Sequence, residues 1–181
     1  MDKKRCVWCN KKNPLYVEYH DREWGRLRTD DRYLYEMLIL ESFQAGLSWE
    51  CVLLKREAFR KAYEGFNIER VIAFDERKIK ELCENKDIIR NSLKIKASIK
   101  NSRIFKEIMQ EYGSFYEYLK GFAGERVIYE TGKNANTLSN AISADLKKRG
   151  MSYVGSVIIY SYLQAIGIIY SHEKNCFLHK K

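Results

Sequence analysis

Residues 146–165 read LKKRGMSYVGSVIIYSYLQA and join two helical patterns through a short turn with a glycine near each end. Gly150 follows the cationic end of the first pattern, and glycine readily adopts the left-handed conformation that is common just past a helix C-terminus. Gly155 leaves room for another backbone to approach closely, and Ser156 can cap the next helix with its hydroxyl. The stretch therefore predicts a helix, a tight glycine-bounded turn and a second helix.

The predicted turn suits contact with an anion. Free backbone N–H groups at the start of the second helix form a site for a phosphate, and Lys148 stands at the end of the first helix. Helix-hairpin-helix modules hold the DNA backbone in this way without reading base sequence. We therefore expect a hairpin module over about 138–169 that contacts DNA through Gly150, Gly155, Ser156 and Lys148. A plain pair of helices, for which the two glycines would suffice, is the alternative.

Helical patterns dominate the rest of the chain as well. Apolar residues recur at helical spacing in further segments, namely 32–44, 49–63, about 75–84, 88–113 and 114–122. Residues 121–137 carry glycine and asparagine without a period, which predicts a surface loop with a short strand at 126–130. We expect one all-α domain over 1–181, in which the hairpin helices span 138–148 and 156–169 and the two ends of the chain are loop-like.

The composition favours a polyanion as partner and argues against a membrane. Thirty-three Lys and Arg against 24 Asp and Glu give a net charge of +9, which attracts nucleic acid, although a solvated surface could also carry it. No apolar run is long enough to span a bilayer, and the first residues lack the apolar core of a secretory signal. We therefore expect a cytoplasmic protein whose five cysteines are thiols or metal ligands rather than disulfides.

Cysteine and histidine gather at the two ends of the chain. Tetrahedral zinc needs four such donors, and six candidates are present, namely Cys6, Cys9, His20, His172, Cys176 and His179. A metal shared by both ends would hold together segments that are too irregular to pack alone. Two unrelated clusters of reduced thiols and surface histidines are the alternative reading.

Glu41 interrupts an apolar helical face. It follows four apolar residues and shares one face of the predicted helix with Leu34, Met37 and Leu38. A carboxylate in such a stripe costs several kcal/mol unless it is paired, hydrogen-bonded or neutralised. The helix ends a few residues later, and Trp49 begins the next one across a short turn. We therefore expect Glu41 to point inward near Trp49.

Aromatic residues are concentrated in the N-terminal segment. Trp8, Tyr16, Tyr19 and Trp24 come from a stretch that looks loop-like. Aromatic walls and one inward carboxylate suit a flat, electron-poor or cationic ring, through stacking, cation–π attraction and a charge-assisted hydrogen bond. The alternative is that Glu41 pairs with a core arginine or a backbone N–H.

Several blocks of the sequence carry a family resemblance. They read RCVWCNKKNPLYVEYHDREWG from Arg5, LILESFQAGLSWECVLLKRE from Leu38, DIIRNSLKIKA from Asp87, the hairpin stretch quoted first, and HEKNC from His172. In this order they resemble the 3-methyladenine DNA glycosylase I family over nearly the whole chain. The resemblance implies an all-α, helix-hairpin-helix glycosylase fold with an active-site cleft between helical lobes. It also implies hydrolysis of the N-glycosidic bond of 3-methyladenine in alkylated DNA.

The resemblance also assigns roles in the base-binding pocket. Glu41 would be the catalytic residue that contacts the extruded base, with Tyr19 as a second polar contact. Trp49 would stack on the base, and Trp8 and Tyr16 would complete the pocket. Because methylation already weakens the glycosidic bond, Glu41 would select and stabilise the departing base more than activate water.

A structural zinc ion and a DNA partner follow from the same resemblance. Its zinc ligands fall on Cys6, His20, His172 and Cys176, which leaves Cys9 and His179 as spares. Leu47, at the tip of a turn, is a candidate wedge that enters the base stack; a core role is its alternative.

The resemblance further implies a monomeric, prokaryotic repair enzyme that acts on double-stranded DNA in the nucleoid, without a membrane. It implies a monofunctional glycosylase, since no desolvated pocket lysine of the kind a lyase needs is indicated. A non-catalytic, zinc-containing helix-hairpin-helix module that only binds DNA is the main competing hypothesis. An RNA-binding protein that prefers splayed single strands is the third.

Overall fold

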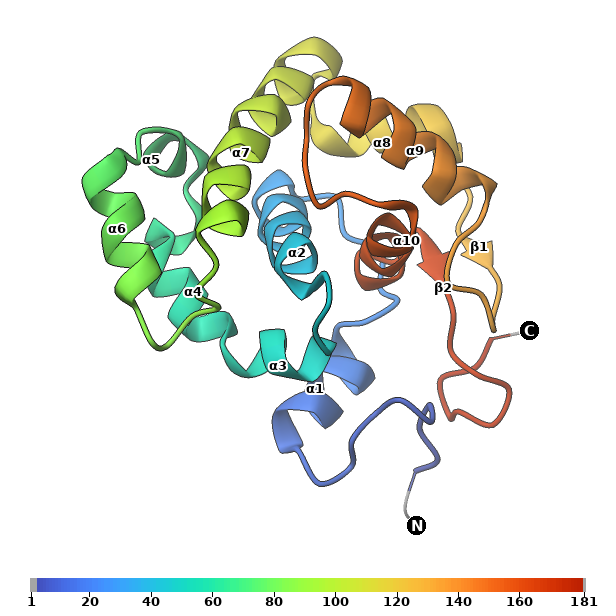
Figure 1. Ribbon diagram of the computed structural model, residues 1–181. Helices are drawn as coiled ribbons and strands as arrows, with labels where there is room; N and C mark the ends of the chain where they lie inside the picture. Colours follow the sequence, from blue (N-terminus) through green and yellow to red (C-terminus); the bar gives the residue numbers. More distant parts are fainter. Residues whose placement is uncertain (1–2, 181) are drawn as a thin grey trace.

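The structure is a computed structural model that describes residues 3–180, and it is mainly helical (Figure 1). This confirms the expected class in its coarse form. The described elements are α1 (Pro14–Arg22), α2 (Asp31–Gln44), α3 (Trp49–Leu54), α4 (Arg56–Ala62), the 3-10 turn η1 (Glu64–Phe66), α5 (Ile68–Ile72), α6 (Glu76–Glu84), α7 (Ser92–Tyr112), α8 (Phe115–Ala123), β1 (Ile128–Tyr129), α9 (Thr137–Lys148), α10 (Ser156–Ala165) and β2 (Ile169–Tyr170). None of the helices in this part of the chain is both long and apolar enough to cross a membrane.

The centre of the fold is α2. Every residue from Leu34 to Phe43 is buried, and the helix packs against α7 on one side and α10 on the other (Figure 1). A helix that is buried all round has no solvent-facing side on which a charged residue could escape. Its position therefore explains why Glu41 has to lie inside the protein.

Three predicted helix starts agree with side-chain caps. Asp30, Ser48 and Ser114 each accept a hydrogen bond from a backbone N–H in the first turn of the following helix, which satisfies one of its free donors. The helix predicted over 88–113 begins at Ser92 instead of 88, because Asn91 caps it there. The segment 49–63 was predicted as one helix, and this is wrong. It breaks into α3 and α4, because the N–H of Lys55 bonds to the carbonyl of Val52, three residues back.

The N-terminal segment is more regular than its sequence pattern indicates. The prediction of a loop-like segment is wrong over α1, which carries Tyr16 and Tyr19. Asn13 caps this helix and Pro14 occupies its first turn, a combination that favours a helix start. That pair was the available signal, because the helix itself has no clear apolar stripe.

The hairpin between α9 and α10 has the predicted left-handed glycine. Gly150 has a φ of +100°, its N–H bonds to the carbonyl of Lys147, and that of Met151 bonds to Leu146. This pair of bonds closes the end of α9 as a Schellman motif. The prediction that Ser156 caps α10 is wrong: Gly155 is the N-cap, without a side-chain bond.

The second hairpin helix is shorter than predicted. It ends at Ala165 rather than at 169, because Ile169 and Tyr170 form β2, which pairs in parallel with β1 inside the predicted strand 126–130. Gly167 makes this exit possible. It has a φ of +80°, and a Cβ there would lie 2.2 Å from the backbone of Arg26 and Leu27.

The two ends of the described chain lie together. The N–H of Phe177 bonds to the carbonyl of Lys4, and the C-terminal segment folds back toward the N-terminal loop at the lower right of Figure 1. Segments about 170 residues apart in sequence are thus neighbours in space, as a metal site shared by both ends requires.

Candidate functional site

A cavity of about 190 Å³ lies among α1, the C-terminal end of α2, the start of α3, and α10. Its lining contains all five residues that the sequence proposed for a base pocket. The full set is Trp8, Tyr16, Tyr19, Trp24, Glu41, Gln44, Trp49, Ser161 and Gln164. The sequence arguments did not single out the last two residues or give Gln44 a role in the pocket. Their signal was weak: Gln44 lies one turn after Glu41, and Ser161 and Gln164 are polar residues in an otherwise apolar helix.

Glu41 is buried in this cavity without a partner. Only 2% of its surface is exposed, and its Oε2 atom has no hydrogen bond. Arg56, the buried arginine of this region, pairs with Glu23 and Glu36 instead, so the alternative of a pairing with a core arginine is wrong. Burial raises the pKa of the Glu41 carboxyl well above its usual value. In the described structure Glu41 therefore favours the neutral, protonated form.

Two further polar atoms in the cavity lining lack partners. They are Nε1 of Trp49 and Oε1 of Gln44, both buried. Each such buried polar atom costs about 1–3 kcal/mol when it is left without a hydrogen bond. Three of them around one small cavity indicate that the cavity is shaped for a polar ligand rather than for core packing.

The walls of the cavity are aromatic rings. Tyr19 and Trp49 have ring centroids 5.4 Å apart, and Trp8 lies 5.4 Å from Tyr16 and 4.8 Å from Trp24. Burial, followed by the nearby Glu41 charge, raises the pKa of Tyr19, and burial raises the pKa of Tyr16 to about 12. Both phenols therefore keep their protons at neutral pH and can donate hydrogen bonds. The arrangement suits one flat ring that carries positive charge.

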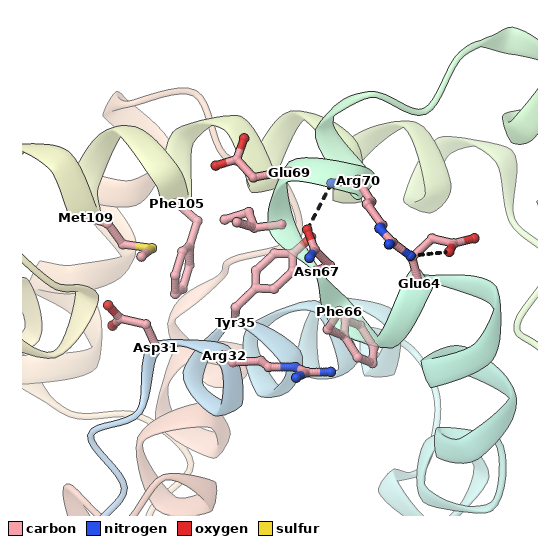
Figure 2. Close-up of a pocket in the computed structure, with 11 residues that line it drawn as sticks. Asp31, Arg32, Tyr35, Glu64, Phe66, Asn67, Glu69, Arg70, Phe105 and Met109 are labelled. Carbon is pink, nitrogen blue, oxygen red and sulfur yellow. Dashed lines mark hydrogen bonds and ion pairs between the residues drawn. The ribbon is translucent and has the colours of Figure 1, made fainter.

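A larger cavity, of about 490 Å³, lies near the start of α2 (Figure 2). Its charged side chains are already engaged. Arg32 donates to the carbonyl of Gly65, Arg70 pairs with Glu64, and Asp31 accepts from the backbone N–H of Phe115. Because these charges have partners, the smaller cavity around Glu41 is the better candidate for chemistry.

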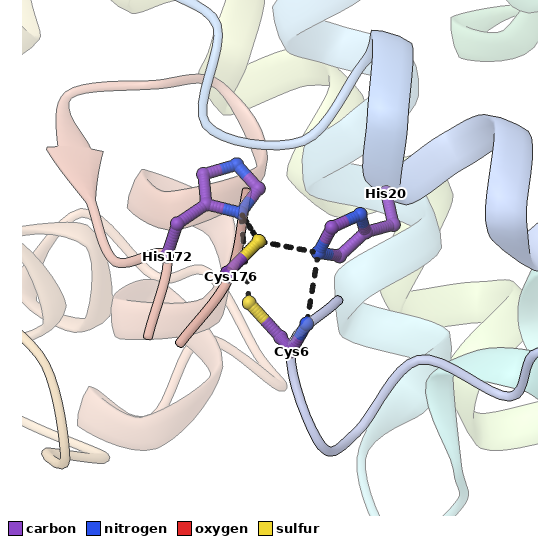
Figure 3. A group of neighbouring side chains, drawn as sticks. All are labelled: Cys6, His20, His172 and Cys176. Atoms are coloured by element: carbon purple, nitrogen blue, oxygen red, sulfur yellow. Dashed lines mark hydrogen bonds between the residues drawn. The ribbon is translucent and has the colours of Figure 1, made fainter. Parts of the chain in front are cut away.

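A cluster of cysteine and histidine joins the two ends of the chain. Cys6, His20, His172 and Cys176 are all buried, and their donor atoms lie within 4.8 Å of one another (Figure 3). These are the four residues that the family resemblance selects from the six candidates. Cys9 instead lies 3.9 Å from the carbonyl of Tyr16, and Nδ1 of His179 lies 2.7 Å from the carbonyl of His172.

The distances in this cluster fit a tetrahedral metal. The Sγ atoms lie 3.5 Å from a histidine nitrogen in each of the three pairs, Cys6 with His172, Cys176 with His20 and Cys176 with His172. Bonds of about 2.3 Å to sulfur and about 2.0 Å to nitrogen, at a tetrahedral angle, would separate these atoms by roughly 3.5 Å. The cluster could therefore hold a metal ion with little movement of the side chains.

Its electrostatics support the same conclusion. Burial lowers the pKa of His172 to about 4 and also lowers that of His20, so both rings are neutral, as metal ligands must be. The Nδ1 atom of His20 lies 2.8 Å from Asp21, which Arg5 holds in turn; such a carboxylate fixes the ring for metal binding. Burial raises the pKa of Cys6 to about 12, and a cation is what would stabilise its thiolate here.

The residues proposed for DNA contact occupy the surface. Leu47 is 43% exposed, directly after Gly46, which has a φ of +79°. Lys148 is also exposed, and Gly155 has no atoms within 4 Å of the position a Cβ would take. These positions are open to a large partner, and their contact with DNA stays a prediction.

Comparison with known proteins gives concordant matches. The family model described as methyladenine glycosylase matches residues 8–179. The curated DNA-3-methyladenine glycosylase 1 of Escherichia coli (strain K12) is 38% identical over 178 residues, 95% of each chain. A crystal structure of 3-methyladenine DNA glycosylase I (TAG) superposes with a TM-score of 0.93 at 38% identity, over 98% of this chain and 100% of that one. A variant of 3-methyladenine DNA glycosylase I in complex with 3-methyladenine has a TM-score of 0.92 at 30% identity, over 98% of each chain.

Proposed function

The chain belongs to the methyladenine glycosylase family, and we propose that the cavity around Glu41 is where its base substrate is bound and released. The protein is a monofunctional DNA-3-methyladenine glycosylase of base-excision repair, which hydrolyses the N-glycosidic bond of the alkylated base. The observation that carries the assignment of the site is the buried, unpartnered Oε2 of Glu41 among aromatic rings.

Recognition of the base rests on charge and shape. Methylation at N3 makes adenine a cation, and Glu41 ionises when this cation enters, because the pair then forms a charge-assisted hydrogen bond. The phenol of Tyr19 adds a second polar contact, and Trp49 offers a ring face for stacking. Unmodified adenine is neutral, so Glu41 stays protonated, no charge-assisted hydrogen bond forms, and this base binds more weakly.

Glu41 stabilises the departing base rather than activates water. It is the one carboxyl group in the lining of the cavity. Asp145, on the first hairpin helix, is occupied by the hydroxyl of Tyr118 and by Arg149. Methylation has already weakened the glycosidic bond, so a strong general base is not required. Lys94 is a buried amine of this region, but its Nζ donates to two carbonyls outside the cavity lining, which does not fit a lyase nucleophile.

The protein binds double-stranded DNA and extrudes the damaged nucleotide from it. A base inside a duplex is out of reach of the cavity, so the nucleotide is flipped at a cost of a few kcal/mol, less for a damaged base. Exposed Leu47 fills the gap that the base leaves. The hairpin, through Gly150, Gly155 and Ser156, contacts a phosphate of the double strand, and the protein acts as a monomer.

A zinc ion in the cluster of Cys6, His20, His172 and Cys176 has a structural role. Two thiolates and two neutral imidazoles are a donor set that zinc prefers, and four protein ligands leave no position for a reacting water. The ion would hold the N-terminal and C-terminal segments together. Trp24 and His172 are in ring contact, so the ion also supports the wall of the cavity.

The direct test is the release of bases from DNA. Duplex DNA treated with a methylating agent is incubated with the protein, and the freed bases are separated by chromatography. The proposal expects 3-methyladenine in the soluble fraction and unmodified adenine to stay in the DNA. A module that only binds DNA would retain methylated and unmethylated duplexes alike and release no base, which would refute the proposed function.

A further inference from the structure

Lys94 is a buried cation in the first turn of α7. It is 8% exposed, and its Nζ donates to the carbonyl of Phe43 at 2.8 Å and to that of Ala45 at 2.5 Å. These carbonyls belong to the C-terminal end of α2, where the helix dipole favours a positive charge. Lys94 therefore closes the end of the helix that carries Glu41.

The charge of Lys94 is not neutralised within the protein. Lys94 makes no ion pair with a carboxylate among residues 3–180, and burial lowers the pKa of its ammonium group without an opposing acidic group. Two neutral carbonyls compensate a buried ammonium only in part. The group also has three N–H donors, and two of them serve the carbonyls. A buried cation with spare capacity suits an anionic ligand.

The position of Lys94 indicates which anion this is. Ala45 leads directly into the exposed turn that carries Leu47. The Nζ of Lys94 also lies 5.7 Å from the ring centroid of Tyr153, in the hairpin turn. Further along α7, Asn101 exchanges two hydrogen bonds with Ser152 of the same turn. Lys94 thus stands between the two surface turns that we expect to contact DNA.

We propose that the ammonium group of Lys94 binds a backbone phosphate of the damaged DNA strand, between the Leu47 turn and the hairpin. The inference rests on the proposed function, since it requires that DNA lies across both turns. The phosphate supplies the counter-charge that Lys94 lacks, and at the same time the bound strand is held against the turn that fills the flipped-out position. The competing role is purely structural, with Lys94 as a cap of α2 and no ligand.

The salt dependence of DNA binding separates these two roles. Each protein–phosphate contact contributes about 0.9 to the slope of log K against log salt concentration for duplex DNA. The probe is a DNA duplex that contains a tetrahydrofuran abasic analogue. Its affinity is measured at KCl concentrations from about 50 to about 200 mM, over which this salt effect can be resolved. Lys94→Met should lower the magnitude of the slope by about 0.9, so that the fourfold rise in salt weakens the variant about 3.5-fold less than the wild type. Lys94→Arg should restore the slope.

Lys106→Met is the matched control, because it removes one positive charge from the same helix at a residue that pairs with Glu69. Its slope should equal that of the wild type. A Lys94→Met slope equal to the wild-type slope would overturn the inference, even if the affinity falls, because a structural cap changes affinity without changing the number of phosphate contacts. If Lys94→Met fails to fold by circular dichroism, Lys94→Gln, which keeps a donor for the carbonyls, is judged by the same slopes.

The failure of this inference is distinct from the failure of the proposed function. If the proposed function is wrong, the wild-type protein releases no 3-methyladenine. If only the inference on Lys94 is wrong, the wild-type protein releases the base normally and the slopes of Lys94→Met and Lys94→Gln remain unchanged.

Discussion

Trp24 lies edge-on to His172, with ring centroids 4.7 Å apart. Trp24 lines the cavity that contains Glu41, and His172 is one of the four residues of the cysteine–histidine cluster. The candidate metal site and the candidate base pocket therefore share a wall. Any change that opens the cluster also frees one side of the pocket.

We expect that loss of the metal weakens both stability and base binding. Cys6→Ser should abolish stoichiometric zinc, as measured by elemental analysis, because the three remaining donors no longer complete a tetrahedron. A loss of several kcal/mol would lower the melting temperature by about 10 °C for a chain of this size. Binding of free 3-methyladenine, followed by calorimetry, should weaken in parallel. Cys9→Ser should retain one zinc per chain, and equal loss of zinc in both variants would contradict the assignment of ligands.

Glu41→Ala should lose excision without unfolding. The charge-assisted hydrogen bond to the cationic base is worth roughly 1.5–3 kcal/mol, so single-turnover release of 3-methyladenine should fall about 10- to 150-fold. Zinc content and helical circular dichroism should remain at the wild-type level. Glu84→Ala, which replaces an exposed glutamate on α6, serves as the control. Undiminished excision by Glu41→Ala would remove Glu41 from the site.

The free energy of unfolding of the ligand-free protein should depend on pH because of Glu41. Burial raises the pKa of Glu41 in the folded state, so the folded protein binds more protons than the unfolded chain once the pH exceeds the ordinary pKa of a glutamic acid. Its contribution to stability is complete below that pKa and is lost as the pH rises toward the folded-state pKa. Glu41→Gln does not titrate. The free energy of unfolding of Glu41→Gln, relative to the wild type, should therefore grow with pH by up to about 1.4 kcal/mol per pH unit.

Urea unfolding at a series of pH values between 5 and 8 checks this prediction on zinc-loaded protein. A constant difference between wild type and Glu41→Gln across this range would show that Glu41 has an ordinary pKa in the folded protein. Addition of free 3-methyladenine should stabilise the wild type more than the variant, because only the wild type has a carboxyl proton that it can transfer to the neutral free base to form a charge-assisted hydrogen bond.

Leu47→Ala should impair excision from duplex DNA and spare the base pocket. The side chain is exposed at a turn outside the cavity lining, so its loss should leave the affinity for free 3-methyladenine unchanged. Release of the base from duplex DNA should fall several-fold, because the vacated stack is no longer filled and flipping costs a few kcal/mol. Leu54→Ala, at a position that is 61% exposed, provides the control. A normal rate for Leu47→Ala would eliminate the wedge role.

The sequence predicted the features that depend on near neighbours. Asp30, Ser48 and Ser114 cap the helices they precede because a cap needs only the next three residues. Gly150 is left-handed because the end of α9 requires it. The inward direction of Glu41 followed from its place on an apolar helical face. The start of α1 at Asn13 and Pro14 also depends only on near neighbours. It was missed because the helix has no clear apolar period.

The sequence could not decide which distant groups meet. Spacing alone left six candidate ligands open, and only the folded chain brings Cys6 and His20 to His172 and Cys176. Likewise, Ser161 and Gln164 enter the cavity because of how α10 packs beside α2, and Gly167 is needed because Arg26 and Leu27 pass so close. These contacts depend on residues more than a hundred positions apart, so no local pattern encodes them.

The sequence by itself thus determined the mainly helical class, several of the helix starts, and the presence of one carboxylate among aromatic residues, since each follows from periodicity or capping over a few positions. The tertiary structure alone decided that Glu41 is left without a partner and that Lys94 is buried without a counter-charge. The physical reason is that burial and pairing depend on every element packed around a side chain. For both residues, those elements come from separate parts of the chain.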